Sequence, residues 1–266
     1  LGDRNDFRPV GIEHKLGIHA SPTCVMAYEG ATAELVGQPN QGLSHMFVMM
    51  NAARLAVGVE GVGIAEMAYQ HALAYALDRR QGRSIWSGEA NAPIFDHPDV
   101  RRTLAVMKAR IEAARGLCLA TAVAADMARH AEPDRRAGWK AREDLFTPIA
   151  KAWSTDMACD VASQGVQIHG GMGFIEETGA AQYMRDARIA PIYEGTNGIQ
   201  AMDLVGRKLS QDGGEAAKVL MADMSDTLIL LGQLFSGKPV ERFANALEAV
   251  RDATFWLLDA KSDPAR

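Results

Sequence analysis

The stretch MFVMMNAARLAVGVEGVGIAEMAYQHALAYAL, residues 46–77, decides the fold class. Apolar side chains recur in it at the three- and four-residue spacing that places them on one face of an α-helix. Its many alanines and glycines allow neighbouring helices to approach closely. We predict one helix of about ten turns, which begins near Gly42 and ends at the run Arg79-Arg80-Gln81-Gly82.

Two more long helices are expected after it. Asp96 is a suitable N-cap, and Pro98 suits the first turn, for a helix from about Asp99 to His130. The next helical pattern runs from about Lys140 to Ile168, and Pro148 is expected to break or tighten it.

Shorter helical segments complete the predicted architecture. One is expected around Ala181–Arg188 and another after Thr196, and residues 215–236 and 239–260 predict a helical hairpin. Three long antiparallel helices and a shorter fourth favour an up-and-down helical bundle. The predicted fold class is therefore mainly α.

The first forty residues have a different character. Short apolar or β-branched runs at Thr23–Tyr28 and Ala33–Val36 are separated by glycine and proline. They predict two or three β-strands, which are too few to form a stable sheet alone.

Composition excludes several classes of protein. The chain has 28 basic and 33 acidic residues and a net charge of −5, so it lacks the positive field that a nucleic-acid partner requires. Cys24, Cys118 and Cys159 are far apart, which indicates reduced thiols and an intracellular protein. We expect no membrane span, because no uninterrupted apolar run reaches about 18 residues. The chain begins without methionine, so we expect a fragment of a longer protein.

Several cofactor and metal motifs fail. The run Gly171-Met172-Gly173 is not a dinucleotide fingerprint, because Glu176 stands where the third glycine is needed. The sequence has no P-loop and no G-x-S-x-G nucleophile elbow. Its seven histidines show no zinc-binding spacing, so no metal site is predicted.

The run Ile192-Tyr193-Glu194-Gly195-Thr196-Asn197 carries the strongest functional signal. Thr196 or Asn197 can cap the helix that follows, and Gly195 allows a tight turn before it. Glu194 is thus expected at the mouth of a helix. The alternative interpretation is a solvated glutamate in a connecting loop.

Two further stretches suit a large or phosphorylated ligand. The glycines of Gln167–Phe174 let backbone approach such a ligand, although such a run taken alone is more often a helix C-cap followed by a tight turn. The cations of Arg79–Arg83 can neutralise phosphates, although cations are also favoured at any helix C-terminus.

Taken in order, these stretches resemble the acyl-CoA dehydrogenase family, from about Val10 to Leu209. The most specific parts are Gln167–Phe174 and Tyr193–Thr196, joined by Arg185-Asp186-Ala187. The run Ala20–Met26 and the helical extension most resemble the larger subfamily that includes 3-methylmercaptopropionyl-CoA dehydrogenases. The resemblance implies a flavoenzyme that uses FAD to introduce a double bond between the α and β carbons of an acyl-CoA thioester, with electrons passing to an electron-transferring flavoprotein.

The resemblance also implies roles for residues around the turn. Glu194 matches the base that removes the α-proton, and Arg54 matches the residue near that carboxylate. Some family members carry the base immediately before this arginine, but Ala53 stands there and cannot accept a proton. Tyr193 and Gly195 match substrate-binding positions.

Six positions match cofactor contacts. Arg79 and Gln81 resemble contacts to the FAD pyrophosphate, although the family's Arg-x-x-Phe-Gly pattern is shortened here and lacks the phenylalanine. The others resemble contacts to the adenine half or the flavin: Gln167, Gly170, Gly171 and Thr196.

The implied organisation divides the chain into three parts. Residues 1–40 match the end of a middle β-domain, residues 41–209 a C-terminal four-helix-bundle domain, and residues 210–266 the start of a helical extension. Part of the FAD site comes from a neighbouring subunit in this family, which implies a homodimer or homotetramer, here in the cytoplasm. We expect the chain alone to bind FAD poorly. The alternatives are an acyl-CoA oxidase and a non-catalytic helical oligomerisation module.

Overall fold

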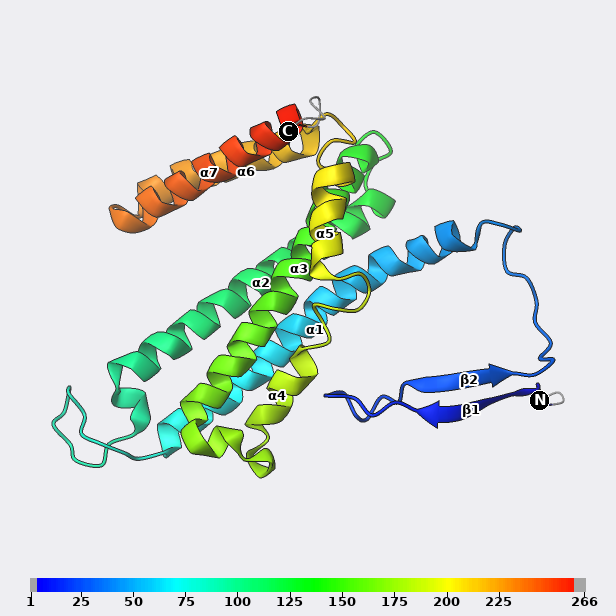
Figure 1. The fold of residues 1–266 in the computed structure, drawn as a ribbon. Coiled ribbons are helices and arrows are strands. Elements are labelled where there is room, and N and C mark those ends of the chain that lie inside the picture. The colour runs from blue at the N-terminus through cyan, green and yellow to red at the C-terminus, as the bar shows by residue number, and fades with distance from the viewer. Residues whose placement is uncertain (1–3, 261–266) are drawn as a thin grey trace. The chain divides into compact units, whose positions relative to one another are not determined.

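The computed structural model describes residues 4–260. The mainly helical fold predicted from the sequence is confirmed (Figure 1). The strands are β1 (Phe7–Ile12) and β2 (Cys24–Tyr28). The helices are α1 (Gly42–Asp78), α2 (Pro98–His130), α3 (Arg136–His169), α4 (Ala180–Ala187), α5 (Asn197–Asp203), α6 (Glu215–Leu234) and α7 (Lys238–Ala260). Short 3₁₀ turns are η1 (Ile94–Asp96), η2 (Gly170–Phe174) and η3 (Glu176–Thr178), and η4 (Leu204–Lys208) is a π-helical turn.

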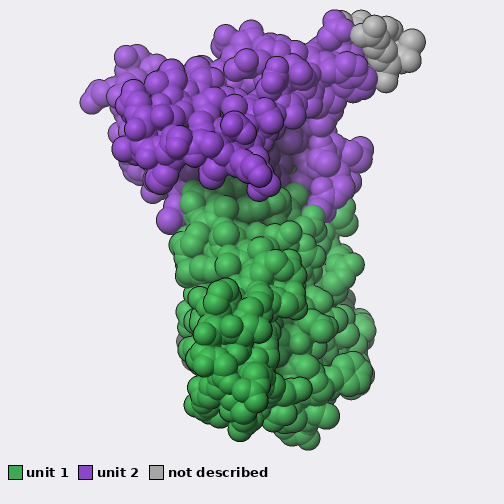
Figure 2. All heavy atoms as spheres, turned by 90° about the vertical axis from the view of Figure 1, so that its left-hand side faces the viewer, with its two compact units in different colours: residues 1–118, 151–196 green, residues 119–150, 197–266 purple. Residues whose placement is uncertain are grey.

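The chain divides into two compact units, which Figure 2 colours separately. One unit comprises residues 1–118 and 151–196, and the other comprises residues 119–150 and 197–266. α2 and α3 therefore contribute a part to each unit. The predicted boundaries at residues 40 and 209 follow the sequence resemblance, and they stay a prediction.

The strands differ from the prediction. β1 and β2 pair antiparallel, with an irregularity in register between Pro9 and Gly11. β1 was not predicted, because proline and glycine interrupt its apolar pattern. The strand expected at Ala33–Val36 is wrong: this segment forms no strand in the structure. An apolar run becomes a strand only where another strand pairs with it, and periodicity does not report that partner.

The break expected at Pro148 is also wrong, because α3 continues through this residue. Proline removes one backbone donor from the helical ladder. Its neighbours Phe146 and Ala150 are buried, and packing of this kind contributes more to a protein helix than intrinsic propensity does.

Within the first unit, α1, α2 and α3 pack side by side with alternating direction (Figure 1). The Arg115 guanidinium on α2 pairs with Glu66 of α1 at 2.7 Å, and Arg110 pairs with Asp160 of α3 at 3.4 Å. A Cβ added to Gly61 of α1 would lie 2.9 Å from the backbone oxygen of Ser154. Small residues thus set the close approach of α1 to α3, as the glycine-rich pattern predicted.

Among residues 4–260, α1 is the one helix whose length and apolar composition suffice to cross a membrane. The core helices of globular proteins meet the same criterion. α1 also buries Arg54 and carries Glu60 and Glu66, and these side chains bond to residues of neighbouring segments. Its most apolar window is 28% buried in this structure, and large side chains such as Val48 and Met49 are exposed.

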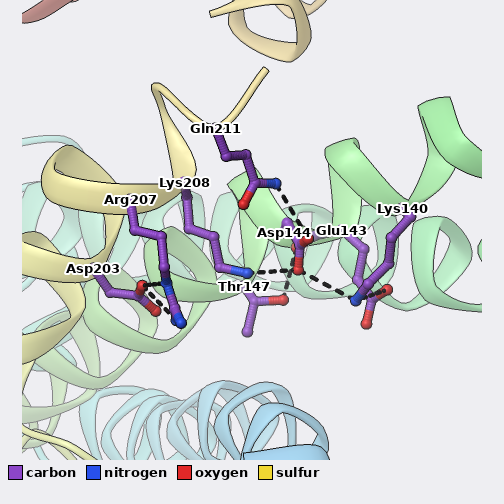
Figure 3. A network of polar contacts seen from close by, with 8 residues as sticks. All are labelled: Lys140, Glu143, Asp144, Thr147, Asp203, Arg207, Lys208 and Gln211. Carbon is purple, nitrogen blue, oxygen red and sulfur yellow. Dashed lines mark hydrogen bonds and ion pairs between the residues drawn. The ribbon is translucent and has the colours of Figure 1, made fainter. Parts of the chain in front are cut away.

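In the second unit, α6 and α7 form the predicted helical hairpin, which turns at Gly237. A polar network in the same unit joins α3 to η4 (Figure 3). The Lys208 ammonium lies 2.7 Å from a carboxylate oxygen of Asp144, and Lys140 lies 3.2 Å from the same oxygen. Burial tends to raise the pKa of Asp144, but these two ammonium groups outweigh it and lower the pKa overall.

Candidate active site and cofactor pocket

Glu194 lies in the turn between α4 and α5 with an unusual backbone conformation. Its φ is +54°, and Gly195 follows at +85°. The left-handed region costs a residue with a Cβ about 1–2 kcal/mol. Such outliers persist only where surrounding contacts hold them, and they cluster at functional sites. Glycine would relieve the strain at position 194, but it carries no carboxylate.

Contacts from α1 hold this turn. The Arg54 side chain is 4% exposed, and its Nε–H donates to the backbone oxygen of Glu194 at 3.4 Å. The Tyr193 hydroxyl donates to the carboxylate of Glu60, six residues further along α1. Burial and the neighbouring Glu60 raise the pKa of Tyr193, so its hydroxyl stays protonated as a donor. The structure therefore brings Arg54 and Glu194 together, as predicted.

Lys151 is a residue of this site that sequence reasoning missed. It lies on α3 and its side chain is fully buried. Burial lowers its pKa to about 8; Asp156 opposes this shift, the positive charge of Arg54 adds to it, and Glu194 opposes it. A buried ammonium thus shares the surroundings of Arg54 and Glu194. The sequence contains a signal for this burial, because the spacing of Lys151, Ser154 and Ala158 places them on one helix face, and that face is buried.

A cavity of about 670 Å³ lies beside Tyr193 and Glu60. Residues 15–23 close one side of it and the segment from Arg185 to Tyr193 closes another. Most of the other lining side chains are aliphatic or basic: Lys15, Leu16, Ile18, Arg188, Ile189 and Ile192. Tyr193 therefore lines a cavity, and its substrate-binding role stays a prediction. Gly195 does not line this cavity.

The segment that closes the cavity is fixed to α4. The Ile18 N–H donates to a carboxylate oxygen of Asp186 at 2.6 Å, and Ile18 itself has a φ of +49°. A Cβ added to Gly17 would lie 2.7 Å from the backbone oxygen of Arg185. Only glycine permits this approach, which explains one of the matched stretches in physical terms.

A second cavity, of about 410 Å³, gathers four of the predicted cofactor residues: Arg79, Gln81, Gly170 and Gly171. The other two lie elsewhere. Gln167 is exposed and does not line this cavity, and Thr196 belongs to the turn that follows Glu194. The structure therefore brings four of the six predicted residues together, and Gln167 and Thr196 lie outside that cavity.

The residues of this second cavity fit an anionic ligand. Arg79 forms no ion pair with any residue from 4 to 260, whereas Arg80 beside it pairs with Glu89 at 3.1 Å. Gly170 has a φ of +59°, and a Cβ added there or at Gly171 would meet no atom within 4 Å. A guanidinium without an ion-pair partner among the described residues, in one cavity with open glycine backbone, suits a phosphate-bearing group.

His169 packs against the protein interior directly before the Gly170-Gly171 turn. It is 3% exposed, and its Nδ1–H donates to the Gly165 carbonyl at 2.8 Å. The ring packs between Tyr75 and His71, with centroids at 4.4 and 4.6 Å. Burial lowers the pKa of His169, so its ring is held in the neutral form. Its Nε2 is enclosed by protein, so His169 braces the glycine turn and offers no polar atom to a ligand.

Comparison with known proteins matches residues 40–209 to the acyl-CoA dehydrogenase C-terminal domain. The chain is 49% identical over 99% of its length to 3-methylmercaptopropionyl-CoA dehydrogenase from Ruegeria pomeroyi, and covers 45% of that protein. It resembles the structure of butyryl-CoA dehydrogenase from Megasphaera elsdenii with a TM-score of 0.65 and 32% identity, covering 79% of this chain and 50% of the other.

A structure described as an electron transferring flavoprotein of Acidaminococcus fermentans matches with a TM-score of 0.66 and 30% identity, covering 80% and 51% of the two chains. The chain spans about half the length of the relatives it matches. The family-model match covers more than half of the chain, and it agrees with the fold and with the residues gathered around Glu194. The chain belongs to the acyl-CoA dehydrogenase family.

Proposed function

We propose that this chain forms the helical part of an FAD-dependent acyl-CoA dehydrogenase, with Glu194 as the base that removes the α-proton of an acyl-CoA thioester. The observation that carries the proposal is the left-handed Glu194, held against α1 beside a cavity of about 670 Å³. A backbone strained by about 1–2 kcal/mol is explained if this position needs a carboxylate.

The residues around Glu194 would prepare it for proton transfer. Glu194 is half-buried, and the buried Arg54 guanidinium donates to its backbone oxygen, which would hold the carboxylate in place for proton transfer. Tyr193 and Gly195 would hold the thioester beside the carboxylate. Bound FAD would supply the acceptor for the hydride that leaves the β-carbon.

Bound FAD would contact the chain at two places, the cavity at the C-terminal end of α1 and the turn after Glu194. Arg79 and Gln81, with Gly170 and Gly171, would bind the phosphates and adjacent nucleotide. Thr196 would contact the flavin near Glu194. Gln167, whose side chain is exposed, would contact the adenine half of FAD. Because the chain covers about half the length of its relatives, we expect it to bind FAD weakly by itself.

We further propose a cytoplasmic homodimer or homotetramer with no membrane span and no nucleic-acid partner. Apolar side chains beside the second cavity support assembly, since Phe174 is 85% exposed and Met172 and Ile175 are about half exposed. Electrons would pass to an electron-transferring flavoprotein, a name carried by one of the matched structures. In this assembly residues 1–40 complete a β-domain, residues 41–209 form the bundle and residues 210–266 begin a helical extension.

Exchange of the α-protons of a CoA thioester into D₂O, followed by NMR with the full-length enzyme, tests the assignment. Glu194→Gln should abolish exchange while flavin absorbance is retained, because the amide cannot accept the proton. Glu177→Gln is a matched control, since Glu177 is an exposed carboxylate of η3. Unchanged exchange in Glu194→Gln would remove Glu194 from the mechanism.

The same preparation separates the alternatives. Peroxide formed under air would assign an acyl-CoA oxidase, which uses the same base but passes electrons to oxygen. Retained assembly with neither flavin binding nor α-proton exchange would assign a non-catalytic oligomerisation module.

A further inference from the structure

The pairing of Tyr193 with Glu60 lies outside the roles proposed so far. Their side chains are 133 residues apart in sequence, and the Tyr193 hydroxyl donates to the Glu60 carboxylate. Arg54, also on α1, donates to the backbone oxygen of Glu194. Glu60 and Arg54 are six residues apart, roughly 9 Å along the helix axis. Two consecutive residues of the turn are thus tied to α1 at two separate points.

The local backbone shows why a tie at Tyr193 matters. The turn after α4 is held by hydrogen bonds from the Ile192 and Tyr193 amides to the Ile189 carbonyl, at 2.8 and 3.1 Å. The left-handed conformation begins at the next residue, Glu194. Tyr193 is therefore the point where a regular turn gives way to a strained one, and its side chain anchors that point.

We propose that Glu60 is a positioning residue for the base: through the Tyr193 hydroxyl it fixes the turn against α1 and keeps Glu194 in its left-handed conformation. The inference rests on the proposed function only for the role of Glu194. A hydrogen bond to a carboxylate is stronger than a neutral one, so glutamate suits this anchoring role. Both side chains also line the cavity of about 670 Å³, so the same bond fixes the orientation of the Tyr193 ring at the wall of that cavity.

Amide hydrogen exchange of residues 190–197 in this chain tests the anchor without substrate or cofactor. Glu60→Ala and Tyr193→Phe should each speed exchange in this segment by roughly tenfold to a hundredfold, the range expected for one charge-assisted hydrogen bond. The double variant should exchange no faster than either single variant, because both remove the same bond. Glu60→Gln keeps an acceptor and should restore most of the protection.

Glu66→Ala is the matched control, since Glu66 lies on α1 but pairs with Arg115 of α2. It should leave exchange in residues 190–197 unchanged. Equal exchange in wild type and Glu60→Ala, or additive effects of Glu60→Ala and Tyr193→Phe, would overturn the proposal.

Kinetics of the full-length enzyme give a second measurement. A misplaced base slows proton removal more than it weakens binding, so Glu60→Ala should lower kcat by roughly tenfold or more with a smaller change in KM, and Glu60→Gln should recover most of kcat. If wild-type enzyme exchanges no α-protons but the amide results hold, the proposed function fails and the anchor stands. If α-proton exchange depends on Glu194 but Glu60→Ala changes neither kcat nor amide exchange, the anchor fails alone.

Discussion

The close approach of α1 and α3 predicts opposite effects for two glycines on one helix. A Cβ at Gly61 would lie 2.9, 3.2 and 3.3 Å from three atoms of the Ser154–Thr155 backbone, whereas a Cβ at Gly63 would meet nothing within 4 Å. Alanine gains about 0.5–1 kcal/mol over glycine inside a helix at either position. Only Gly61→Ala also forces two backbones apart, which costs about 1–3 kcal/mol.

We therefore expect Gly63→Ala to stabilise the chain by up to about 1 kcal/mol. Gly61→Ala should instead be less stable than Gly63→Ala by about 2 kcal/mol, because the propensity gain is common to both variants and only the clash differs. Urea unfolding followed by circular dichroism measures both, and equal m-values would show that the comparison is valid. Equal stability of the two variants would refute the close packing of α1 against α3.

Three further predictions concern charged residues. Glu194→Gly should leave the free energy of unfolding unchanged or raise it by up to about 1 kcal/mol, because it relieves the left-handed strain. Urea unfolding of this chain measures the change, and a large destabilisation would contradict the strain. The same variant of the full-length enzyme should lose α-proton exchange. Asp144→Asn should destabilise the chain by about 2 kcal/mol at neutral pH, through loss of the charge-assisted bond to Lys208. Because the folded-state pKa of Asp144 is lowered, its contribution is present above the unfolded carboxyl range, near pH 4, and is lost as the pH falls towards the folded value. Denaturation at several pH values should show that the variant loses less stability at acid pH than the wild type does. An equal pH dependence of the two proteins would count against the pairing of Asp144 with Lys208. The pKa of Lys151 is lowered from 10.5 to about 8. Between these two pH values the unfolded chain binds more protons than the folded chain, so the free energy of unfolding of the wild type should rise with pH there. Lys151→Met should lack this rise, and the same alkaline pH profile in both proteins would argue against the burial of a titrating lysine.

The long helices were predictable because their signals are local. The apolar spacing of residues 46–77 and the glycine at the turn of the α6–α7 hairpin lie within the segments they determine. The predictions were wrong where contacts with a distant part of the chain determine the secondary structure. Ala33–Val36 has the composition of a strand but forms none, and packing keeps α3 helical through Pro148 against the local preference.

The same division holds for the site. Glu194 and Arg54 were identified from motifs, and the structure places them in contact through a backbone hydrogen bond. The bond between Tyr193 and Glu60 has no local signature, because it joins residues 133 positions apart. Lys151 is intermediate: its position on a buried helix face could have been read from periodicity, but its proximity to Arg54 and Glu194 depends on how α3 packs.

The length of α1 limits which residues one molecule of the proposed cofactor can contact. Arg54 beside Glu194 and Arg79 at the C-terminal end of the helix are separated by about seven turns of one rigid rod, roughly 38 Å. That span exceeds the reach of a single dinucleotide. The flavin that meets Glu194 and the phosphates that meet Arg79 must then belong to different FAD molecules, so each copy of the chain would serve the base of one active site and the nucleotide pocket of another. On this assignment a monomer can complete neither, and dilution that separates the copies should release cofactor and activity together.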